Sequence, residues 1–114
     1  MAKTTTEVIQ SHLMKRLEGD LEGDIQENFS PDIIILSSYG VFRGHDGIRQ
    51  SAGKLDDDIG EAEFIYNHTQ IEGNYALLEW SARDGKRAVC DGADSFVVEN
   101  GKIVLQTIHY SAQS

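Results

Sequence analysis

The chain has 114 residues, 39% of them hydrophobic and 8% aromatic, which is enough for one compact domain over residues 1–114. Its 19 acidic against 10 basic residues give a net charge of −9, which argues against nucleic acid or an anionic membrane as partner. The N-terminal stretch lacks the apolar core of a secretory signal, and a lone cysteine, Cys90, excludes an internal disulfide, so we expect a cytoplasmic protein.

The first two elements along the chain are predicted helices. Apolar side chains recur at helical spacing from about Thr4 to Glu18, and Gly19 can end this helix. A shorter helix should run from its cap Asp20 to Phe29, and Pro31, the only proline, marks the break after it.

A strand and a third helix follow. The β-branched and aromatic run from Asp32 to Phe42 predicts a buried strand that turns at Gly40 into a short second one. Apolar residues then recur every three or four positions from Gly44 to Ile59, which predicts a helix with Asp46 as a plausible cap.

From Glu61 onward the hydrophobic period changes to two. The stretches 61–73, 74–85, 86–101 and 102–113 read as four strands joined by Asn-Gly and Asp-Gly type hairpin turns, an antiparallel meander. The third of these strands is long enough that it must bend, and Gly92 is a natural place for a bulge. We therefore predict an α+β fold in which the N-terminal helices cover the concave face of a strongly curved antiparallel sheet.

The stretch "AVCDGADSFVV" places a carboxylate, Asp94, in a row of small and apolar residues. Alternation puts it on one face with Cys90, Gly92 and Phe96, and Cys90 is expected to be a packing residue there. Asp94 could pair with a cation of the neighbouring hairpin, Arg83, Lys86 or Arg87. Alternatively it lies inside the fold, where burial raises the pKa of a carboxyl group and a neutral acid could donate a hydrogen bond to a carbonyl oxygen.

Four motifs, "GDLEGDIQENFSPDIIIL", "GVFRGHDGIR", "LLEWS" and "DGADSFVVENGKIVLQTIHY", resemble the SnoaL-like branch of the nuclear transport factor 2-like superfamily. The resemblance implies a cone-shaped α+β barrel with an internal pocket, and commonly a homodimer through the outer sheet face. The superfamily includes ketosteroid isomerase, limonene epoxide hydrolase, scytalone dehydratase and polyketide cyclases, alongside members that only bind.

The resemblance also suggests catalytic positions. It puts His12 on the oxyanion-hole tyrosine of ketosteroid isomerase and Asp94 on its oxyanion-hole aspartic acid, whereas the base position falls at Ser37. A serine without an adjacent base accepts no proton from carbon, so steroid isomerisation is disfavoured, and no Asp-Arg-Asp set of the epoxide hydrolases is found. A His12–Asp94 pair across the cone is the candidate catalytic site, and the alternative for His12 is a satisfied core residue.

Candidate ligand-binding residues lie on the last strands and near the first one. In the last strand Gln106, Ile108 and Tyr110 share a face, which the family register makes pocket lining, and His109 lies on the opposite face. Tyr39 flanks the expected pocket mouth. Trp80 is either a ligand platform or a core or interface anchor.

No cofactor or metal is expected. The four histidines have no close metal-ligand spacing, and the acidic run 56–58 reads as a solvated helix end. The leading hypothesis is a cofactor-free isomerase, cyclase or dehydratase that acts on an apolar carbonyl or hydroxyl compound. A ligand-binding domain without catalysis and a dimeric protein-interaction module are the alternatives.

Overall fold

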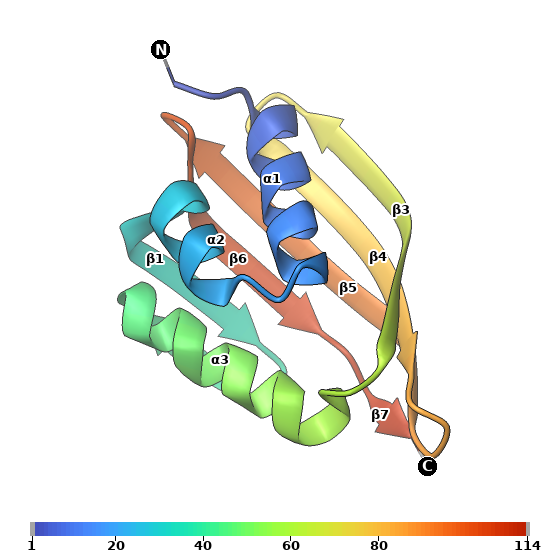
Figure 1. The fold of residues 1–114 in the computed structure, drawn as a ribbon. Helices are drawn as coiled ribbons and strands as arrows, with labels where there is room; N and C mark the ends of the chain where they lie inside the picture. The colour runs from blue at the N-terminus through green and yellow to red at the C-terminus, as the bar shows by residue number, and fades with distance from the viewer. Residues whose placement is uncertain (1, 114) are drawn as a thin grey trace.

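A computed structural model describes residues 2–113 as three helices laid over one curved sheet (Figure 1). The sheet order is β2, β1, β6, β5, β4, β3, with the short β7 paired to β5, so β2 and β3 are free edges and the sheet stays open. The predicted α+β class is confirmed, but the sheet is mixed and not wholly antiparallel as predicted, because β1 pairs with β6 in parallel. The helices are α1 (Thr5–Leu17), α2 (Leu21–Asn28) and α3 (Gly44–Ile59), and the strands are β1 (Phe29–Ser37), β2 (Gly40–Arg43), β3 (Glu63–Glu72), β4 (Tyr75–Arg83), β5 (Ala88–Glu99), β6 (Lys102–His109) and β7 (Ala112–Gln113).

The helix ends follow local chemistry in two of three cases. Thr4 and Glu7 form a reciprocal capping box at the start of α1, and the Asp20 side chain accepts the Gly23 amide at the start of α2. The prediction of Asp46 as the cap of α3 was wrong. Arg43 occupies that position without a side-chain cap, and Asp46 lies in the first turn, where it pairs with Arg49.

The four C-terminal strands form the predicted meander, with two departures from the expected bounds. The chain leaves β6 after His109 and returns as β7 against β5. In addition, β1 starts directly after α2, so Pro31 lies within the strand and does not mark a break. The β1–β6 register shifts between Phe29 and Ile34, and this irregular stretch accommodates a residue that has no N–H to donate.

A register shift in β5 lies where a bulge was expected, beside Gly92. Between the β4 and β5 partners Trp80–Gly92 and Ala82–Val89, β5 carries one residue more than β4. Alternation therefore changes phase, so that Val89 is buried and Cys90 is exposed. The expected packing role of Cys90 was wrong for this reason.

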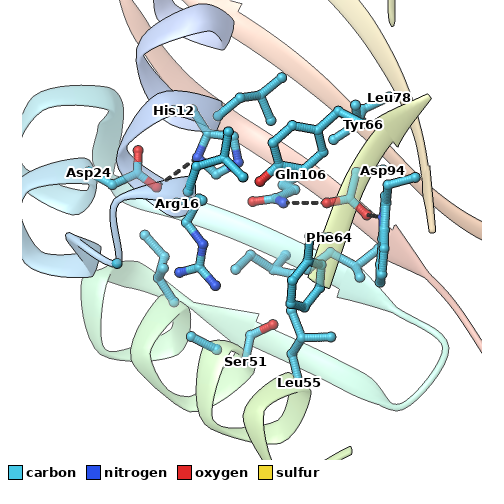
Figure 2. A pocket seen from close by; sticks show the side chains of 18 of the residues that line it. His12, Arg16, Asp24, Ser51, Leu55, Phe64, Tyr66, Leu78, Asp94 and Gln106 are labelled. Atoms are coloured by element: carbon cyan, nitrogen blue, oxygen red, sulfur yellow. Dashed lines mark hydrogen bonds and ion pairs between the residues drawn. The ribbon is translucent and has the colours of Figure 1, made fainter. Parts of the chain in front are cut away.

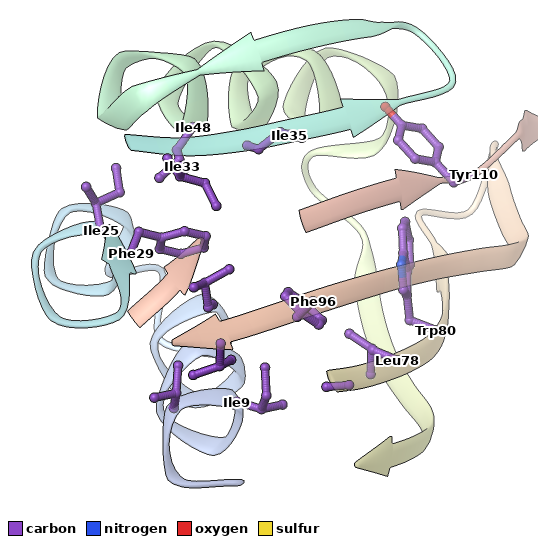
Figure 3. Close-up of a cluster of buried hydrophobic side chains, with 14 of the residues drawn as sticks. Ile9, Ile25, Phe29, Ile33, Ile35, Ile48, Leu78, Trp80, Phe96 and Tyr110 are labelled. Carbon is purple, nitrogen blue, oxygen red and sulfur yellow. The ribbon is translucent and has the colours of Figure 1, made fainter. Parts of the chain in front are cut away.

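The core lies between the helices and the concave face of the sheet (Figure 3). At one end lie Ile9 of α1, Ile25 of α2 and Phe29, the first residue of β1, and Phe96 of β5 belongs to the same buried cluster. At the other end Trp80 and Tyr110 pack ring against ring, with centroids 5.7 Å apart. Within residues 2–113, no helix is long and apolar enough to cross a bilayer.

Candidate functional site

A cavity of about 380 Å³ lies between the helices and the concave face of the sheet (Figure 2). Its wall is mostly apolar, with side chains such as Leu13, Ile48, Phe64 and Leu78. Polar and charged groups interrupt this wall, and they include His12, Arg16, Glu18, Asp24, Tyr39, Ser51, Tyr66, Asp94 and Gln106. An apolar enclosure with a few convergent polar groups is typical of a small-molecule site.

Asp94 lies on the inner face of β5 and is 8% exposed. The Trp80 Nε1–H donates to its Oδ1 at 3.1 Å, and the Gln106 Nε2–H donates to its Oδ2 at 3.0 Å. Burial raises the pKa of Asp94 from 3.8 to about 6, although both hydrogen bonds favour the charged form. The alternative of a pairing with Arg83, Lys86 or Arg87 was wrong.

Gly92 explains why the tryptophan reaches this carboxylate. Gly92 is the cross-strand partner of Trp80, and a Cβ at that position would overlap the indole ring. Because the glycine lets the ring lie flat against β5, the indole N–H meets Asp94 two residues further along. Trp80 thus lines the cavity and also holds Asp94.

His12 is 7% exposed on α1 and is held by a carboxylate of α2. Its Nδ1 lies 2.7 Å from Oδ2 of Asp24, a residue that is 1% exposed, and Asn28 donates to the other oxygen at 2.9 Å. Since a carboxylate can only accept, Nδ1 carries the proton, and the neutral ring keeps its lone pair on Nε2. The Phe29 and Phe96 rings pack against the imidazole in T-shaped arrangements, each with centroids 5.4 Å apart.

His12 and Asp94 line the same cavity but do not form a direct pair. Each has partners of its own, Asp24 for the histidine and Trp80 with Gln106 for the aspartate. The two groups therefore face one enclosed space from opposite layers, the helices and the sheet.

The structure places the other predicted residues in two groups. Tyr39, Trp80, Gln106 and Ile108 line the cavity. Tyr110 does not line it, because β6 ends at His109 and the Tyr110 hydroxyl instead donates to Asp58 at 2.7 Å. Burial and this carboxylate raise the pKa of Tyr110.

The structure also tests the predictions for Asp58 and His109. Asp58 accepts from Lys54 as well as from Tyr110, so it is not simply a solvated helix end. His109 is exposed and faces Asp91 on the surface, as the expected strand register requires.

Several polar residues of the cavity were missed from the sequence, among them Asp24, Arg16 and Tyr66. Asp24 stands four positions before Asn28, the spacing that puts both on one face of a helix. Arg16 follows His12 by the same four positions. Tyr66 alternates with Phe64 on the inner face of β3, and its hydroxyl points into the cavity (Figure 2). Burial raises the pKa of Tyr66.

Ser37, the position of the base in ketosteroid isomerase, lies outside this cavity. Its hydroxyl donates to the Gly40 carbonyl oxygen at 2.7 Å and so closes the β1–β2 turn. Among residues 2–113 no three His, Cys, Asp or Glu side chains come together as a metal site.

Comparison with known proteins identifies the fold. An NTF-2 like protein of unknown function from Burkholderia xenovorans LB400 superimposes with a TM-score of 0.76 at 21% identity, over 94% of this chain and 82% of that one. TerC, co-crystallized with polyporic acid, gives 0.76 at 14% identity over 94% and 91%. A candidate SnoaL-like polyketide cyclase from Mesorhizobium loti gives 0.71 at 16% identity over 95% and 100%. At these identities the likeness shows the fold alone.

The sequence comparison shows the family. Residues 14–106 match the profile of the SnoaL-like domain, while a search of curated proteins gave no match. The family and its fold relatives include polyketide cyclases and isomerases, which share the architecture and differ in chemistry. The predicted resemblance is confirmed, and the chain belongs to the SnoaL-like domain family.

Proposed function

We propose that the cavity binds a mostly apolar small molecule with a carbonyl or hydroxyl group, and that His12 and Asp94 move a proton on it. The reaction class is a cofactor-independent isomerisation, cyclisation or dehydration. The observation that supports this most is the placement of two ionisable side chains, from the helices and from the sheet, on the wall of one apolar cavity. Such reactions require one group that takes a proton and another that gives one, both within reach of the same bound substrate.

His12 supplies the base that Ser37 cannot. With Nδ1–H held by Asp24, the free lone pair of Nε2 can take a proton from a carbon next to a carbonyl group. The electrons of the broken C–H bond move into the carbonyl group, and its oxygen becomes an enolate oxygen. Where the substrate has a carbon–carbon double bond next to the deprotonated carbon, the enolate extends over it, and returning the proton to the far carbon of that bond shifts the double bond and completes an isomerisation.

Asp94 serves the oxygen end of the same molecule. With a pKa of about 6, the free protein holds it mostly ionised at neutral pH, with the neutral acid as a fraction of about one tenth. A ligand that displaces the remaining water favours the neutral acid further, because burial disfavours charge. The neutral acid donates to the enolate oxygen, or gives its proton to a departing hydroxide in a dehydration.

A panel of apolar carbonyl compounds tests this proposal, with polyporic acid, the compound in the TerC structure, as one probe. Binding is followed by the fluorescence of Trp80, the only tryptophan, and turnover by ultraviolet absorbance. For a compound that is turned over, Asp94→Asn and His12→Gln should each lower kcat by about a hundredfold or more, and Ser37→Ala, outside the cavity, should not. Turnover that survives both substitutions contradicts the proposal.

The second candidate is a ligand-binding domain without catalysis, which the structural role of Ser37 favours. This hypothesis predicts tight binding of a probe with no turnover above the uncatalysed rate. Any turnover that depends on Asp94 excludes it.

For the quaternary structure we propose a homodimer through the outer face of the sheet. Cross-strand pairing aligns Tyr75, Val97, Leu105 and Ile34 in one row on that face, and Tyr75 is 64% exposed. The adjacent row contains Leu77 and the 44% exposed Leu36. An exposed apolar patch of this kind is typical of a protein–protein contact.

Sedimentation equilibrium tests the dimer. The wild type should be dimeric at micromolar concentration, Leu77→Lys should be monomeric, and Ile65→Lys, at an exposed apolar position outside these rows on edge strand β3, should stay dimeric. A monomeric wild type contradicts the proposal.

A further inference from the structure

Arg16 is a cationic side chain in the cavity wall with no anionic partner. It lies one turn after His12 on α1, and its guanidinium group extends toward Ser51 and Leu55 of α3 (Figure 2). Among residues 2–113 no carboxylate lies within ion-pair distance of it, although the chain has 19 acidic and 10 basic residues. By contrast, Arg49 on α3 is held by both Glu22 and Asp46.

The acids of the cavity make no ion pair with Arg16. Asp24 gives its two oxygens to His12 and Asn28, and Asp94 gives its two oxygens to Trp80 and Gln106. Glu18 is exposed at the rim and makes no ion pair with Arg16. The guanidinium fork is therefore free to bind a group that enters the cavity.

Arg16 also lies at the end of the cavity that faces the helices. Together with Leu55 and Phe64 it lines both the cavity and a shallow hollow beside α3, whereas Asp94 lies on the sheet. A ligand held by both residues would have an anionic group at the helical end and its carbonyl or hydroxyl group near the sheet.

We propose that Arg16 binds the carboxylate of the ligand, so that the cavity selects an apolar carbonyl or hydroxyl compound that is also a carboxylic acid. The planar guanidinium group matches a carboxylate in a bidentate geometry, and a partly buried pair of this kind is stronger than one in water. The inference rests on the proposed ligand-binding function, and it adds a substrate class and an orientation.

The test compares phenylpyruvate with its methyl ester, which differ in the carboxylate charge. Trp80 fluorescence and calorimetry give Kd values for the wild type, Arg16→Gln, Arg16→Lys and the control Arg49→Gln. We expect the wild type and Arg49→Gln to bind the acid at least about tenfold more tightly than the ester. Arg16→Gln should lose this preference, and Arg16→Lys should keep part of it.

A second measurement tests anion binding at Arg16 with a probe smaller than phenylpyruvate. Benzoate at millimolar concentration should shift the NMR signal of the Arg16 Nε–H, and the absence of a shift overturns the inference. Equal binding of acid and ester, or a preference that survives in Arg16→Gln, also overturns it. Either of these results would leave the proposed acid–base chemistry at His12 and Asp94 standing. Conversely, if the probes bind through Arg16 but are never turned over, the acid–base proposal fails and Arg16 remains the anion site.

Discussion

Asp24 and Asp94 are two buried carboxylates in the wall of one cavity, and their environments differ in one respect. Asp24 accepts from the His12 ring, which can carry a positive charge, and from Asn28. Asp94 accepts only from the neutral donors Trp80 and Gln106. Two neutral hydrogen bonds do not offset the loss of water, so the pKa of Asp94 rises to about 6. The comparison teaches that the hydrogen-bond partner decides the role: Asp24 holds the His12 ring, and Asp94 is the carboxyl group for which we propose proton exchange.

The largest expected effect concerns Asp94→Asn and pH. The folded protein binds the Asp94 proton more tightly than the unfolded chain does, so the wild type loses stability relative to the variant as pH rises from about 4 to about 7. The pKa difference between 3.8 and about 6 corresponds to about 3 kcal/mol in total, of which about 2.4 kcal/mol falls between these two pH values. Urea unfolding of both proteins at the two pH values measures it. An equal stability difference at both pH values would contradict the account of Asp94.

Gly92→Ala should be next in size, because it disturbs the donor side of Asp94. The added methyl group overlaps the Trp80 ring, and overpacking of this kind should lower the free energy of unfolding by between about 2 and 3 kcal/mol. Gly53→Ala is the matched control. A methyl group added at Gly53, which lies in helix α3, would meet no neighbouring atom. Alanine at this position should therefore raise stability by up to about 1 kcal/mol. Equal effects of the two substitutions would rule out the packing of Trp80 on Gly92.

Asp24→Asn tests the other carboxylate. The amide keeps one acceptor but opposes a donor of His12 or Asn28 with its own N–H group, so we expect a loss of about 2 kcal/mol at neutral pH in denaturant unfolding. Asp46→Asn, which alters an exposed pair with Arg49, should change stability within experimental error. Indistinguishable effects at positions 24 and 46 would mean that the His12–Asp24 contact does not stabilise the fold.

Trp80→Phe should have the smallest effect on stability and a clear effect on titration. It keeps an aromatic ring over Gly92 but removes one donor, at a cost of about 1 kcal/mol. Because that donor favours the charged carboxylate, the pKa of Asp94 should rise above about 6. An unchanged pKa would show that the Trp80 indole does not influence the ionisation of Asp94.

The sequence predicted what local chemistry determines. Asn100 and Gly101 have positive φ and form the β5–β6 turn, and this residue pair alone indicates a hairpin. The inward face of Asp94 followed from alternation with Phe96 and Val98, because the strand is regular there. Cys90 was misplaced by the same rule, because strict alternation was continued past the bulge expected at Gly92, and the β4–β5 register shift there reverses the face of Cys90.

The contacts that complete the site depend on packing between elements. The His12–Asp24 hydrogen bond requires the angle at which α1 meets α2, and Arg16 enters the cavity for the same reason. Tyr110 lies outside the cavity wall because the strand is interrupted between β6 and β7. The alternating pattern of the sequence continues through this point and gives no sign of the interruption.

The pKa of Asp94 tests the central claim most directly, because a buried carboxyl with neutral donors is the basis of the proposed proton transfer. Carboxyl-selective NMR titration of the wild type, with Asp94→Asn to assign the signal, measures it. We predict a pKa of about 6. A value at or below 3.8 would show a solvated or ion-paired carboxylate and would contradict the proposed role of Asp94.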